Sequence, residues 1–75
     1  MKIDTFLLEL QEILQRDQAI KLDDSLSDME EWDSLAIMAL IAWFGKHLDL
    51  ALTFNHFKDL KTVADVASLS PAITL

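Results

Sequence analysis

The chain has 75 residues, a formal net charge of −7 and an apolar content of 52%, with one glycine, one proline and no cysteine. This composition predicts one small helical domain over residues 1–75 and excludes disulfides, thiolate metal sites and intrinsic disorder. Such acidity argues against a nucleic-acid partner. No signal peptide is visible, and the longest apolar run, Leu35 to Phe44, is half the ~20 residues that a membrane span needs. We therefore expect a cytoplasmic monomer with no membrane insertion.

The first predicted helix covers roughly residues 3–15, because its apolar residues recur three and four positions apart. A long connection then runs from about residue 16 to residue 33. A structureless connection of this length is unusual in a compact domain. Its regularly placed apolar side chains favour a loop that packs on the core. These are Ile20, Leu22, Leu26 and Met29.

The second predicted helix begins at Ser34 and ends near Leu48. Asp33 is typical of an N-cap, which leaves Ser34 at the first helical position with its hydroxyl toward solvent. When the residues of this helix are placed at 100° intervals around its axis, one side carries bulky apolar residues and the opposite side small ones, with Met38 and Trp43 on the flanks. We expect the bulky side to face the core. The core side consists of Ile37, Leu40, Ile41, Phe44 and Leu48. The outer side consists of Ala36, Ala39, Ala42 and Lys46.

Two further helices complete the predicted fold, one short near residues 55–59 and one over about 62–69. Thr62 with Asp65 three positions later indicates a capping arrangement. Pro71 marks the end of the last helix, and residues 73–75 are predicted to form a loose tail. The fold class is thus all-α, a four-helix bundle of three main helices and one short one, with a long packed loop between the first two.

The polar residues give little support for catalysis or metal binding. The acidic residues from Asp23 to Asp33 lack the glycine that an EF-hand requires at its sharp turn, so they are interpreted as a solvated loop. His47 and His56 are too few for a metal site, and we expect both at the surface. His47 lies roughly 20 Å from Ser34 along one helix, beyond hydrogen-bond reach. No nucleophile elbow surrounds Ser34. The sequence therefore predicts no enzyme and no metal.

A resemblance to a known family rests on the segment Glu31-Trp32-Asp33-Ser34-Leu35, on the apolar positions along the second helix and on the closing segment from Leu60 to Ala67. In these parts the chain resembles the acyl carrier proteins of the phosphopantetheine-binding family. The resemblance covers about residues 3–69. It implies that a separate Mg²⁺-dependent phosphopantetheinyl transferase attaches 4′-phosphopantetheine to Ser34. It further implies a free-standing carrier of acyl thioesters for a fatty-acid, polyketide or other specialised pathway, visited by acyl-loading and acyl-processing enzymes.

The chain departs from the family pattern in two places. Glu31 stands where glycine is common, and the outer side of the second helix carries alanines instead of the acidic residues that dock on basic enzymes. This outer side is a candidate surface for partner enzymes, and Asp33 supports Ser34 as its N-cap. Trp32 and Trp43 are each either core anchors or partner contacts. The candidate partner-binding residues are Trp32, Leu35, Ala36, Met38, Ala39, Ala42 and Trp43.

Two alternatives remain open. A peptidyl or aminoacyl carrier would share the fold and the modified serine. An unmodified acidic adaptor would instead bind its partner through the alanine side of the second helix. The single internal glycine, Gly45, costs roughly 1 kcal/mol relative to alanine and either permits a close approach of another segment or is merely tolerated.

Overall fold

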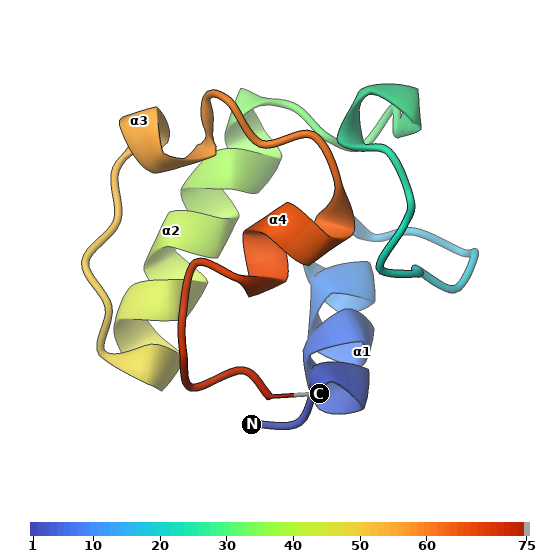
Figure 1. Ribbon diagram of the computed structural model, residues 1–75. Coiled ribbons are helices and arrows are strands. Elements are labelled where there is room, and N and C mark those ends of the chain that lie inside the picture. The colour runs from blue at the N-terminus through green and yellow to red at the C-terminus, as the bar shows by residue number, and fades with distance from the viewer. Residues whose placement is uncertain (75) are drawn as a thin grey trace.

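The computed structural model describes residues 1–74 and is all-α over that range (Figure 1). Helices α1 (Ile3–Leu14) and α2 (Ser34–Leu48) run antiparallel, and the short helix α4 (Val63–Ala67) lies across the space between them. The one-turn helix α3 (Phe54–Phe57) packs near the start of α2. The predicted all-α fold of four helices is confirmed, but α4 is shorter than the helix predicted over about 62–69, so two helices of the described residues are long and two are short. No helix among residues 1–74 is both long and apolar enough to cross a membrane.

A connected group of aromatic rings holds the helices together. Phe6 of α1 and Phe44 of α2 are fully buried, with ring centroids 6.1 Å apart. Phe44 lies 6.3 Å from Phe57 of α3, which in turn lies 6.3 Å from Trp32 in the loop before α2. The core therefore extends from α1 to the segment that leads into Ser34, and this packing fixes the direction in which that segment enters α2.

The connection between α1 and α2 is packed, as predicted, and contains a 3-10 turn, η1 (Leu26–Asp28), that the sequence did not indicate. Leu26 is 2% exposed, and Ile20 and Met29 are similarly buried. The backbone of this loop pairs with the segment that leads into α4. The N–H of Leu26 donates to the carbonyl of Lys61 at 2.9 Å, and the N–H of Val63 donates to the carbonyl of Asp24 at 3.1 Å. These bonds offset the conformational entropy that is lost when so long a connection is held in one conformation.

The predicted cap of the last helix is confirmed. The N–H of Asp65 donates to Thr62 Oγ1 at 3.3 Å, and the N–H of Thr62 donates to Asp65 Oδ2 at 3.1 Å. The N–H of Lys61 donates to the same carboxylate oxygen at 2.9 Å. These two backbone donors, Lys61 first, hold the pKa of Asp65 below its ordinary value.

Asp65→Asn is expected to lower stability in a pH-dependent manner. Because the folded-state pKa of Asp65 is depressed, its ionised form stabilises the fold above the ordinary aspartate pKa, and that contribution is lost as the pH falls through the lowered value. Urea unfolding of both proteins at a series of pH values should therefore give a gap at neutral pH that closes in acid. A gap of constant size would contradict the assignment.

The faces of α2 are rotated from the prediction. Ala36 and Trp43, assigned to the outer side and the flank, are 8% and 7% exposed, whereas Ile37 and Ile41 are only partly buried. Trp43 packs against Phe6, with ring centroids 5.6 Å apart. Phe6 of α1 packs against both Trp43 and Phe44, so the side of α2 that faces α1 includes Trp43.

The tail is also better ordered than predicted. The N–H of Ile3 donates to the carbonyl of Thr74 at 2.6 Å, and the N–H of Thr74 donates to the carbonyl of Met1 at 2.8 Å, so both ends of the described chain lie together (Figure 1). Ile73 is partly buried against the core. The prediction of a loose tail is therefore wrong for residues 73 and 74, and Leu75 lies outside the described residues.

Gly45 is not required for a close approach. A Cβ built there would meet only the carbonyl oxygen of Leu50, at 4.0 Å, which is an ordinary contact. Because glycine is a poor residue inside a helix, Gly45→Ala is expected to raise the free energy of unfolding by about 0.5–1 kcal/mol. The matched control Ala42→Gly, on the same exposed helix surface, should lower it by a similar amount. Urea denaturation measures both, and destabilisation by Gly45→Ala would contradict this account.

Candidate functional site

Ser34 lies at the N-terminus of α2 and is exposed to solvent. Asp33 caps the helix through its side chain, which accepts a hydrogen bond from the N–H of Ala36 at 2.9 Å. The carbonyl of Asp33 accepts the first bond within the helix, from the N–H of Ile37 at 3.0 Å. The prediction that Asp33 caps α2 and leaves Ser34 at its first position is confirmed. The N–H groups of Ser34 and Leu35 precede the helical hydrogen-bond ladder, at the positive end of a 15-residue helix.

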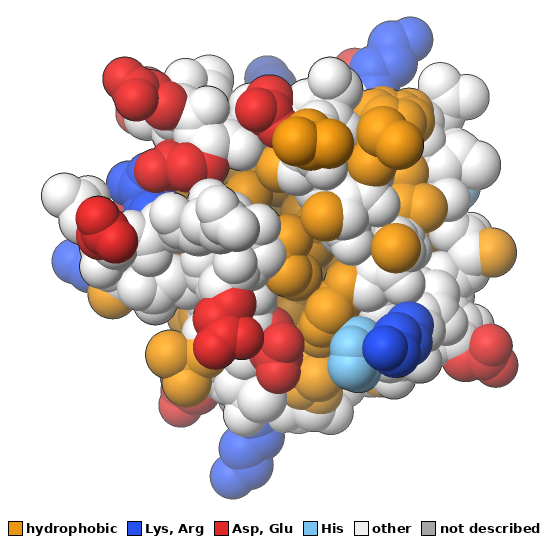
Figure 2. Space-filling model, turned by 180° about the vertical axis from the view of Figure 1, so that it is seen from behind, with side chains coloured by type: hydrophobic (Ala, Val, Ile, Leu, Met, Phe, Trp, Pro, Cys, Tyr) orange, Lys and Arg blue, Asp and Glu red, His pale blue; other side chains and the backbone are white. Residues whose placement is uncertain are grey.

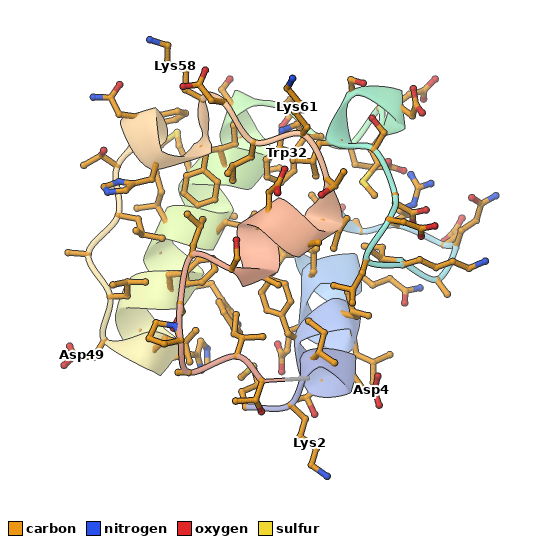
Figure 3. All side chains as sticks on the ribbon, viewed as in Figure 1. Lys2, Asp4, Trp32, Asp49, Lys58 and Lys61 are labelled. Carbon is orange, nitrogen blue, oxygen red and sulfur yellow. The ribbon has the colours of Figure 1, made fainter. Side chains whose placement is uncertain are left out.

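The residues around Ser34 divide into anchors and exposed groups. Trp32 is half-buried against Phe57 and points into the molecule, whereas Lys58 and Lys61 project outward (Figure 3). The structure therefore favours the loop-anchor interpretation of Trp32 over its interpretation as a partner contact. Trp43 is likewise a core residue.

An ion pair fixes the loop two residues before the cap. Arg16 Nη1 lies 2.7 Å from Glu31 Oε1, which ties the loop to the end of α1. A hydrogen bond from its own backbone N–H, with a further contribution from Arg16, lowers the pKa of the Glu31 carboxyl. One signal for this pair is visible in the sequence, because Glu31 replaces the glycine of the family pattern, but nothing there indicates Arg16 as its partner.

The outer surface of α2 next to Ser34 is apolar. Leu35 is 74% exposed and Met38 is 56% exposed, and both Ala39 and Ala42 are exposed. Seen from behind, hydrophobic side chains line a hollow between the two long helices, and acidic side chains gather mainly across it on the α1 side (Figure 2). This part of the predicted outer side lies where the sequence placed it, whereas Ala36 and Trp43 are removed from it by burial.

Neither histidine is arranged as a base for Ser34. His56 Nδ1 accepts a hydrogen bond from the N–H of Thr53 at 3.0 Å and so completes the cap of α3. The ring of His47 lies 5.3 Å from that of Trp43, more than three turns of α2 away from Ser34. Both side chains are exposed, as predicted. The structural role of His56 was missed because Thr-x-x-His is not a standard capping signal.

The site thus consists of an exposed serine at the capped start of a helix, preceded by a packed loop. Similarity to known proteins identifies the family in which this arrangement occurs. The family model described as "Phosphopantetheine attachment site" matches residues 4–69. The chain belongs to the phosphopantetheine-binding carrier family. Members of this family are carriers and not catalysts, their cofactor is phosphopantetheine, and they are modified by a transferase and served by processing enzymes.

A solved structure supports the same fold for this phosphopantetheine-binding carrier. A chain from Mycobacterium tuberculosis, provisionally described as an acyl carrier protein, is 31% identical and aligns with a TM-score of 0.71. The alignment covers 87% of this chain and 88% of the other. No curated protein is significantly similar in sequence.

The residues at the start of α2 fit a phosphodiester-linked group in this carrier. The serine Oγ is the atom through which such an ester forms, and the exposure of Ser34 gives a transferase access to it. The N–H groups of Ser34 and Leu35 and the helix dipole favour an anion at that position. Asp33 has its side chain engaged with Ala36, which keeps the helix start formed when the serine is substituted.

Proposed function

We propose that Ser34 is the residue of this carrier that bears 4′-phosphopantetheine, and that the chain carries acyl groups in a fatty-acid, polyketide or other specialised biosynthetic pathway. The single observation that carries the proposal is an exposed serine at the capped start of the longest helix in a chain of the phosphopantetheine-binding family. When bound, the group supplies a terminal thiol that holds the acyl group as a thioester. The similarity to a chain described as an acyl carrier supports acyl cargo over aminoacyl cargo.

Partner enzymes are proposed to contact the exposed side of α2 beside Ser34. This side consists of Leu35, Met38, Ala39 and Ala42, and it offers apolar area rather than charge. Ala36 and Trp43 are omitted from the proposed surface because they are buried, and Trp32 is omitted because it packs on Phe57. Binding of partners through this side should depend only weakly on salt, since screening acts on charges.

The experiment that tests the proposal is incubation of the purified protein with coenzyme A, Mg²⁺ and a broad-specificity phosphopantetheinyl transferase. Intact mass spectrometry should show the gain of one phosphopantetheine group, and fragmentation should locate it on Ser34. No gain in mass, or a gain located on another residue, would overturn the proposal. Separate incubation of the modified protein with acyl-loading and aminoacyl-loading enzymes distinguishes the acyl carrier from the peptidyl carrier.

A further inference from the structure

A groove between the end of α1 and the start of α2 opens beside Ser34. It encloses about 280 Å³, close to the lower limit of roughly 300 Å³ for pockets that hold small molecules. Both chain neighbours of Ser34, Asp33 and Leu35, line the groove, whereas the Ser34 side chain borders it without lining it. A group attached to Ser34 therefore starts beside the groove. The remaining lining residues are Ile13, Leu14, Gln15, Glu31, Ala36 and Ala39.

The lining of this groove combines polar groups with apolar side chains, among them Ile13, Leu14 and Leu35. Ala36 and Ala39 belong to α2 and present only methyl groups, while Gln15 offers an amide and Glu31 a carboxylate. Glu31 is held in place by Arg16, whose Nη1 lies 2.7 Å from Glu31 Oε1, so its carboxylate is a fixed hydrogen-bond acceptor. The pantetheine arm has matching chemistry, because a hydroxyl and amides alternate with methyl and methylene groups along it.

A second apolar hollow serves as a contrast. It encloses about 250 Å³ between α4 and the paired chain ends, and its lining includes Ile3, Ala67 and Ile73. Neither Ser34 nor either of its chain neighbours contributes to it. Of these two hollows, the α1–α2 groove is therefore the one that a group tethered at Ser34 adjoins. Ala39 lies about 7.5 Å beyond Ser34 along the helix axis, a distance that a short part of the arm covers.

We propose that the phosphopantetheine arm attached to Ser34 lies in the groove between α1 and α2, with its methyl groups against Leu35 and Ala39 and its polar groups directed to Gln15 and Glu31. The proposal rests on the proposed attachment at Ser34. It assigns a resting site to the arm when no enzyme is bound, on the side of α2 that faces α1.

The test is to compare ¹⁵N- and ¹³C-labelled protein before and after complete modification, as established by intact mass. We expect shifts of the Gln15 side-chain amide and of the Ala39 amide, and nuclear Overhauser contacts from the arm's methyl protons to the Ala39 methyl group. Ala39→Phe, which fills the groove from an exposed position, should abolish the Gln15 shift. The matched control Ala42→Phe, one turn further and outside the groove lining, should retain it.

The possible outcomes separate the two proposals. Complete modification with shifts confined to the immediate neighbours of Ser34, or with contacts that appear only after an acyl group is loaded, would overturn the groove proposal and leave the attachment intact. Absence of modification would overturn both. If Ala39→Phe loses its helical circular dichroism, the methyl contacts in the unsubstituted protein still decide the result.

Discussion

Ser34→Ala is expected to abolish attachment of phosphopantetheine completely while leaving the fold unchanged. The side chain is exposed and the N-cap bond runs from Asp33 to Ala36, so the substitution removes the ester-forming oxygen without removing a contact of the core. Stability should change by no more than about 0.5 kcal/mol, the usual range for exposed positions. Intact mass after incubation with coenzyme A and transferase measures the first expectation, and urea unfolding measures the second.

The chain offers a matched control for this variant. Ser27 is also exposed and also lies in the first half of the chain, but it belongs to η1 and not to the start of a long helix. Ser27→Ala should gain the full mass of one group. A Ser34→Ala variant that is still modified would contradict the assignment, as would a Ser27→Ala variant that is not.

Local sequence signals predicted the elements near the site well. The start of α2 was predicted to the residue, because Asp33 satisfies a free backbone donor by its own side chain and needs no distant partner. The cap formed by Thr62 and Asp65 followed for the same reason. Interactions of this kind span three residues, so a single sequence contains all the information that they require.

Features set by contacts between distant segments could not be predicted. Hydrophobic periodicity identified α2, yet it could not tell that Phe6 of α1 would pack against Trp43, which is buried. The bond between the N–H of Ile3 and the carbonyl of Thr74 joins residues at opposite ends of the chain, where composition alone indicated a loose tail. The Arg16–Glu31 pair spans 15 positions and likewise has no local signal.

Phe6→Ala is expected to be the most damaging single truncation among those considered. Phe6 is fully buried and its ring lies 5.6 Å from that of Trp43 and 6.1 Å from that of Phe44, so it joins α1 to α2. Removal of a buried phenylalanine ring costs about 3–5 kcal/mol. A chain of this length has a total stability of about 4–11 kcal/mol at roughly 0.05–0.15 kcal/mol per residue. The loss is therefore a large share of the total stability, and the variant should unfold at a much lower urea concentration than the unsubstituted protein.

The control for this prediction lies two residues away on the same helix. Leu8 is 66% exposed, so Leu8→Ala removes a large apolar side chain from α1 without opening a cavity, and it should change stability by no more than about 0.5 kcal/mol. Far-ultraviolet circular dichroism during urea titration measures both variants. Equal losses for Phe6→Ala and Leu8→Ala would contradict the placement of the core on one face of α1. A large loss for Phe6→Ala alone would show that the α1–α2 contact carries the fold and, through Phe44 and Phe57, supports the loop that presents Ser34.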